Sequence, residues 1–275
     1  MLFWNKQYRF LLKGWLIVFC LLLQACVTTT NSSLTDKADP VVAVGRYVTL
    51  GLEYIKRDDL HRARKHLNRA LEISPLDAPA NAAMGLVYHQ EGETVAAENY
   101  FKQSLETDPS YTRGRSYYGA FLYSVDRIEA ALEQFKLASE DTRYEGRSQI
   151  FSNIALCQLK LGNSAEAIEA YTSTLRLDRS NGRELSGVTE LLIQSNDFER
   201  AQHYYNRLVR LIRERGMQHS AQSLWLGIRI ANYYDSSQQV ITLAGLLEQM
   251  YPDTEENQLA KSLLGKKITL NGASR

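Results

Sequence analysis

Residues 51–75 of this chain read GLEYIKRDDLHRARKHLNRALEISP, and residues 85–109 read GLVYHQEGETVAAENYFKQSLETDP. The second stretch repeats the first at a distance of 34 residues. The repeat is clearest at four positions: Gly51 and Gly85, Tyr54 and Tyr88, Ala63 and Ala97, and Pro75 and Pro109. A period of roughly 20 to 50 residues is typical of solenoids, in which one small structural unit stacks on the next. The pattern therefore predicts an array of stacked repeats.

Each repeat reads as two helices joined by a short turn. Apolar residues recur at helical spacing over residues 47–54 and again over residues 60–71, and a charged run separates the two segments. Gly92 can end a first helix in the left-handed conformation, and Pro109 ends a second helix because it has no N–H to donate. The unit resembles the tetratricopeptide repeat (TPR), a helix-turn-helix of about 34 residues.

Weaker copies extend the array towards the C-terminus. We expect a third unit over residues 112–143, a fourth marked by Gly162, a fifth with Thr189 in place of the small crossing residue, and a sixth that closes at Pro252. Over residues 43–266 the chain is therefore predicted to be all-α, a right-handed α-solenoid of about six TPR helix pairs without strands.

Three local features accompany these units. Residues 141–146 hold an insertion relative to the other repeats. Asn163 and Glu166 have the spacing of a capping box at the start of a helix. Residues 253–266 suit one more helix that caps the end of the array, and we expect residues 267–275 to form a C-terminal tail.

The first 25 residues have the features of an export signal. Lys6, Arg9 and Lys13 precede an apolar run over residues 15–23, which has the length of a signal-peptide core and is short for a membrane span. The run leads into Leu-Gln-Ala-Cys at residues 23–26, which resembles the bacterial lipobox. That resemblance implies removal of residues 1–25, lipidation of Cys26 and, since valine follows the cysteine, sorting to the outer membrane.

Two alternatives remain for this segment: an ordinary signal peptide in which Cys26 is incidental, or an N-terminal membrane anchor. Residues 26–42 contain many Thr, Ser, Asn and Asp residues and no helical period. We expect them to form a flexible tether that holds the folded array clear of the membrane.

Composition and motifs argue against several functions. The formal net charge is +1, and removing the three cations of the first 25 residues leaves −2, so nothing favours nucleic acid as a partner. The sequence has no Gly-rich phosphate loop, nucleophile elbow or CxxC motif. His61 and His66 are five residues apart and point to different sides of a helix, and Cys157 reads as a buried core thiol. We expect no enzyme activity, no cofactor and no metal.

The TPR resemblance also implies a binding surface, because the first helix of each unit lines the concave side of such arrays. Most of the matching positions in the first units are apolar, and we expect them to bind an apolar or amphipathic peptide segment. Alternatively, these side chains pack against the next unit or the tether. The expected groove residues are Val48, Leu52, Ile55, Ala82, Leu86, His89, Ala120 and Tyr123, continued by Ser116, Ser152, Leu156 and Leu159.

Three strings point beyond the generic repeat: YYGAFL at residues 117–122, NIALC at 153–157 and SLWLGIRI at 223–230. With the lipobox and six repeats, they resemble the PilF/PilW family of pilotins, the type IV pilus biogenesis and stability lipoproteins. The resemblance implies an outer-membrane lipoprotein facing the periplasm that binds secretin subunits and promotes their localisation and multimerisation. The alternative is a generic periplasmic TPR scaffold lipoprotein that organises cell-wall or protease complexes.

Overall fold

A computed structural model describes residues 39–273 of the chain, with side chains as far as residue 265. The chain divides into two units, Met1–Ala43 and Val44–Arg275. Of the first unit, only residues 39–43 belong to the described part, and they open helix α2. The expected signal peptide, Cys26 and most of the tether lie outside the described residues.

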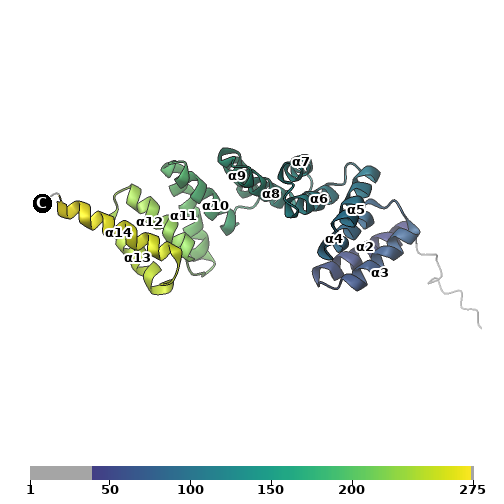
Figure 1. Ribbon diagram of the computed structural model, residues 1–275, viewed down its shortest axis with the longest axis horizontal. Helices are drawn as coiled ribbons and strands as arrows, with labels where there is room; N and C mark the ends of the chain where they lie inside the picture. Colours follow the sequence, from purple (N-terminus) through teal and green to yellow (C-terminus); the bar gives the residue numbers. More distant parts are fainter. Residues whose placement is uncertain (1–38, 274–275) are drawn as a thin grey trace, which may run out of the picture. The chain divides into compact units, whose positions relative to one another are not determined.

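Thirteen helices and no strand form the regular structure of residues 39–273 (Figure 1). The helices are α2 (Pro40–Lys56), α3 (Leu60–Ile73), α4 (Ala78–Gln90), α5 (Thr94–Thr107), α6 (Thr112–Ser124), α7 (Ile128–Ser139), α8 (Arg147–Lys160), α9 (Ser164–Leu177), α10 (Gly182–Gln194), α11 (Phe198–Glu214), α12 (Ala221–Tyr233), α13 (Ser237–Met250) and α14 (Glu255–Ala273).

The helices from α2 to α13 form six successive pairs, and α14 packs on α12 and α13. The prediction of an all-α array of six TPR-like helix pairs is therefore confirmed. The last helix begins where we expected a capping helix and continues beyond Lys266, through most of the expected tail, to Ala273.

The turn inside each pair has the same backbone conformation in all six units. The N–H of the residue after each left-handed position donates to the carbonyl five residues before it, as Asp59 does to Tyr54. This is the Schellman motif, which needs a residue that tolerates positive φ. The residues with positive φ at these six turns are Asp58, Gly92, Asp126, Gly162, Asn196 and Asp235.

The two helices of each of the first three pairs approach closely at a glycine. A Cβ atom on any of these glycines would lie 2.6–2.8 Å from a large, fully buried side chain of the second helix. Since real Cβ contacts are longer, only glycine allows this packing without a shift. The facing pairs are Gly51 and Leu67, Gly85 and Phe101, and Gly119 and Phe135.

The later units keep the close approach by different means. Thr189 occupies the crossing position of the fifth unit, fully buried, and its hydroxyl donates to the carbonyl of Leu185 at 2.7 Å. That bond satisfies the only polar group that the larger residue brings into the core. In the sixth unit Gly227 faces the ring of Tyr205, which belongs to the second helix of the preceding unit.

The expected insertion and the expected capping box have opposite outcomes. Residues 140–146 connect α7 to α8, whereas residues 74–77, 108–111 and 178–181 make the connections between other pairs, so the insertion is confirmed.

The capping box is wrong, because the side chain of Asn163 does not cap α9. Asn163 follows the left-handed Gly162, and its amide instead donates to Gln158 Oε1 at 2.9 Å.

The largest apolar core runs from Ala97 of α5 to Ile230 of α12. Cys157 lies in this core with no exposed surface, and burial raises the pKa of its thiol to about 11. A thiol with such a pKa stays protonated at neutral pH and is a poor nucleophile. The reading of Cys157 as a core thiol is therefore confirmed.

We predict that Gly85→Ala destabilises the array by about 1–3 kcal/mol, because the new methyl group would lie 2.8 Å from the Phe101 ring, which has no open space to enter. Gly45→Ala is the matched control, since nothing lies within 4 Å of its Cβ position on α2. The control should be stabilised by roughly 0.5–1 kcal/mol through helix propensity. Urea unfolding of both variants measures the difference, and equal effects at the two glycines would contradict the packing described.

Candidate peptide-binding face

The first helices of several units contact one another directly. Helix α4 packs on α6, α6 on α8, and α10 on α12, in addition to the contacts inside each pair. On each of these helices, the side chains that do not pack against the second helix of the same pair therefore lie beside side chains of the neighbouring unit. We call the side formed by α4, α6 and α8 the first-helix face.

The expected groove residues fall into two groups. Val48, Ile55 and Ala82 are buried, with exposed fractions of 7%, 7% and 0%. Val48 packs with Ala70 and Ala80, and Ile55 belongs to the core cluster between α2, α3 and α4. For these three residues the alternative that we left open, packing within the array, describes their position.

Most of the remaining expected residues keep some exposed surface. Ser116 and Leu159 are half-buried, whereas Ser152 is buried and donates a hydrogen bond to Glu184 Oε1 at 2.6 Å. Leu156, on α8, is 39% exposed. The other half-buried residues of the expected groove are Leu52, Leu86, His89 and Tyr123, and Ala120 is exposed.

A small apolar hollow lies between α6 and α8 on the first-helix face. Its volume is about 80 Å³, and Ala120, Tyr123, Phe135, Asn153 and Leu156 line it. Small-molecule sites usually measure roughly 300–1,000 Å³, so this hollow suits a single anchoring side chain of a larger partner. We call it the α6–α8 hollow.

Two residues of the α6–α8 hollow were missing from the sequence prediction. Phe135 comes from α7, where it also packs under Gly119, so its second role was not visible from the repeat alone. Asn153 lies three residues before Leu156 on α8, and that spacing places both side chains on one side of a helix. The spacing is the signal that could have identified Asn153.

His89 links the first-helix surfaces of α4 and α6. Its ring meets Phe121 edge-on at a centroid distance of 5.3 Å, and its Nε2 lies 3.3 Å from Ser124 Oγ. Burial lowers the pKa of the His89 imidazole below its usual value. The imidazole is therefore neutral at pH 7 and adds no charge beside the apolar side chains of this face.

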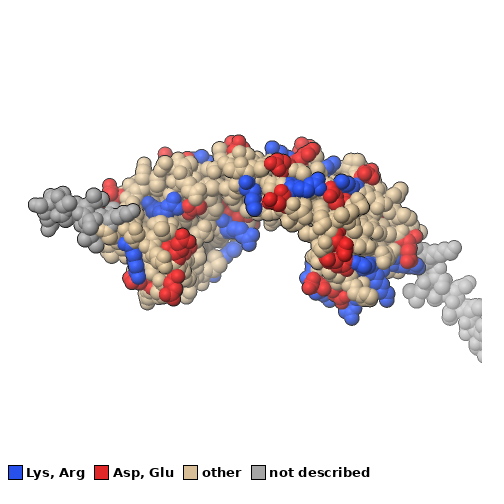
Figure 2. All heavy atoms as spheres, viewed as in Figure 1, with Lys and Arg blue, Asp and Glu red and all other residues tan. Residues whose placement is uncertain are grey.

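The described residues contain no group of three or more His, Cys, Asp or Glu placed to hold a metal ion. His66 stacks on the ring of Tyr54 at 5.3 Å and thus fills space beside the first repeat. Within residues 39–273, no helix is both long and apolar enough to cross a membrane. Figure 2 shows acidic and basic side chains interspersed over the face in view.

Comparison with known proteins places these features in a family. Residues 48–112 and residues 148–181 each match a tetratricopeptide repeat family. The chain is 34% identical over 238 residues to the type IV pilus assembly protein PilF of Pseudomonas aeruginosa, covering 86% of this chain and 92% of that protein.

Solved structures agree with the sequence comparison. The structure of Pseudomonas aeruginosa PilF matches with a TM-score of 0.69 and 31% identity, covering 81% of this chain and 98% of that structure. PilW, a type IV pilus biogenesis factor, matches with a TM-score of 0.61 over 78% of this chain and 97% of its own, and at 20% identity it supports the fold alone. The chain belongs to the PilF family of type IV pilus assembly proteins and is thus a TPR scaffold, not an enzyme.

Proposed function

We propose that this chain is a pilotin, an outer-membrane lipoprotein facing the periplasm that binds subunits of the type IV pilus secretin. In this proposal it promotes their localisation to the outer membrane and their assembly into multimers. Membership of the PilF family supports a role in pilus assembly. The lipobox resemblance at residues 23–26 supports the membrane anchor.

The α6–α8 hollow is the observation that supports the proposed binding of a secretin segment. Its walls are largely apolar and Leu156 is 39% exposed beside it. A leucine or valine side chain of an unassembled secretin segment would remove this surface from water, which is favourable by about 25 cal/mol per Å² of apolar area. Leu86 and the neutral His89 extend the surface onto α4.

Anchoring of the protein to a membrane would then promote assembly of the bound secretin subunits. Acyl chains on Cys26 would hold the protein on one membrane, with each buried CH₂ contributing about 0.8 kcal/mol. Secretin subunits bound to anchored copies are confined to a surface, and confinement raises their effective concentration for one another. Binding and anchoring account for assembly without any chemical step.

We predict that Leu156→Asp lowers the amount of heat-resistant secretin multimer by about tenfold or more, because a carboxylate beside the α6–α8 hollow must lose its water when a segment binds. Leu246→Asp is the matched control, since Leu246 is also 39% exposed but belongs to α13. Circular dichroism should show both variants folded. Equal multimer levels in the two strains would exclude the hollow as the binding site.

We also predict that Cys26→Ala removes secretin multimers from the outer membrane, either by abolishing them or by leaving them in the inner membrane. The reason is that the variant keeps the binding surface and loses the lipid anchor. Membrane fractionation followed by gel analysis without and with strong denaturation measures both amount and place. If deleting the whole gene leaves multimers unchanged in amount and place, the pilotin proposal fails and a generic scaffold takes its place.

A further inference from the structure

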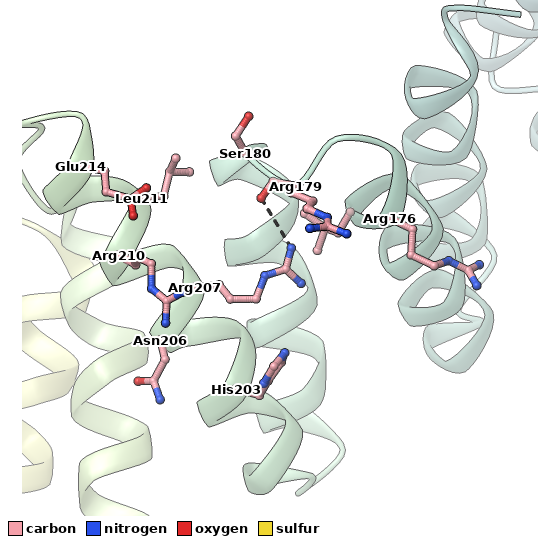
Figure 3. Close-up of a pocket in the computed structure, with 10 residues that line it drawn as sticks. Arg176, Arg179, Ser180, His203, Asn206, Arg207, Arg210, Leu211 and Glu214 are labelled. Carbon is pink, nitrogen blue, oxygen red and sulfur yellow. Dashed lines mark hydrogen bonds between the residues drawn. The ribbon is translucent and has the colours of Figure 1, made fainter.

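A second concave site lies away from the first-helix face, between α9 and α11 (Figure 3). Its volume is about 1,000 Å³, well above that of the α6–α8 hollow. Helices α9 and α11 are the second helices of the fourth and fifth units, and both pack on α10. We call this site the α9–α11 cleft, and it shares no residue with the α6–α8 hollow.

Arginines dominate the α9–α11 cleft. Arg176 and Arg179 come from the end of α9 and the residues just after it, and Arg207 and Arg210 come from α11. Glu214 is the only acidic residue among those that line the cleft. The site therefore carries a strong positive charge in a chain whose acidic and basic residues otherwise balance closely.

The four arginines of the cleft have no acidic partner among the described residues, a feature that they share with several arginines elsewhere in the array. Within the described residues, none of the four forms an ion pair within 4 Å, whereas Arg64 pairs with Glu91 and Arg127 with Glu98. The side chains of Arg176 and Arg207 each donate one hydrogen bond inside the protein, to Ser173 Oγ and to the carbonyl of Arg179. Most of the guanidinium donors in the cleft are thus available to a ligand.

Local helix electrostatics explain only part of this cluster. Arg176 and Arg179 flank the C-terminal end of α9, where the helix dipole favours cations. Arg207 and Arg210 lie inside α11, and with His203 they follow the spacing that lines one side of a helix. The dipole gives no reason for two unpaired cations at that place, and only packing brings them near Arg179, whereas the side chain of Arg176 points away from α11 (Figure 3).

The floor of the α9–α11 cleft is apolar. Leu175 and Leu211 line it and are almost fully buried, with exposed fractions of 2% and 8%. Asn206 and Ser180 add neutral polar groups to its lining (Figure 3). An apolar floor under a rim of guanidinium groups fits a peptide that presents carboxylates beside aliphatic side chains, since guanidinium binds carboxylate through paired hydrogen bonds.

We propose that the α9–α11 cleft binds an acidic segment of a partner protein. A peptide segment can enter a cleft and meet arginines from both of its sides. A flat bilayer of anionic lipid headgroups would instead favour a protruding basic surface, and the arginines here surround a hollow. The proposal stands on this cleft alone and does not depend on the function proposed for the first-helix face.

The test uses the full-length protein in detergent and two labelled peptides of roughly 14 residues, about four helical turns. Both peptides carry the same leucines, and one has glutamate where the other has lysine. Fluorescence anisotropy should show binding of the glutamate peptide that weakens as salt rises. Absence of binding, or equal binding of both peptides, would overturn the proposal.

Arg179→Glu with Arg210→Glu should weaken binding of the glutamate peptide by about tenfold or more. Both side chains line the cleft, and neither makes a hydrogen bond or ion pair with another described residue that the change would break (Figure 3). Arg179→Lys with Arg210→Lys should keep most of the affinity. The control, Arg46→Glu with Arg143→Glu, changes the net charge equally at two exposed arginines outside the cleft and should bind as the unchanged protein does.

Two results would contradict this assignment. Equal losses in the cleft variant and the control would show that net charge alone attracts the peptide. Binding to phosphatidylglycerol vesicles that depends on Arg179 and Arg210, without binding of the glutamate peptide, would identify a lipid site in place of a peptide site.

Discussion

The close approach of two helices at a small residue is the contact on which the rest of this array depends. At Gly85 the backbone of α4 comes so near the Phe101 ring that a Cβ atom would lie 2.8 Å from it. Equivalent contacts recur at Gly51 and Gly119. The first three pairs close at such a point, and the first helices α4, α6 and α8 also contact one another, so the first-helix face with its hollow lies over closely packed helices.

The sequence predicts the helix pairs well because the features that specify them are local. The left-handed turn positions are Gly, Asn or Asp, and the Schellman hydrogen bonds recur even in the weakest repeats. The sequence predicts surface exposure less well. Val48, Ile55 and Ala82 have the spacing of groove residues and are buried. Val48 and Ile55 lie on α2 and pack against residues of α3 and α4, whereas Ala82 lies on α4, which is packed on most of its sides. The alanine-rich stretch of α4, apolar on most sides, is the sequence feature that indicates such burial.

The two concave sites also contain residues whose proximity the sequence does not predict. Within the α6–α8 hollow, Ala120, Tyr123 and Leu156 were expected from the repeat, whereas Phe135 comes from a second helix and enters through tertiary packing. The arginines of the α9–α11 cleft lie more than 25 positions apart between Arg179 and Arg207, and only the packing of α9 and α11 on α10 brings them together. The failure of Asn163 as a side-chain cap has a local reason, because its side chain is turned to donate a hydrogen bond to Gln158, five residues before it.

The two concave sites differ in their chemistry. The first-helix face is apolar and electrically neutral around His89, while the α9–α11 cleft is cationic. Surfaces of such different chemistry suit different segments. In the proposed function, the apolar face holds the secretin segment and the lipid anchor on Cys26 determines at which membrane the complex assembles.

Site-specific crosslinking in living cells tests the central claim most directly. A photoreactive residue placed at Leu156 should crosslink to the pilus secretin, whereas the same residue at Leu246, equally exposed on α13, should not. Crosslinking to the secretin from both positions, or from Leu246 alone, would contradict the assignment of the first-helix face as the binding surface. Crosslinking from Leu156 to an unrelated envelope protein would contradict the pilotin function itself.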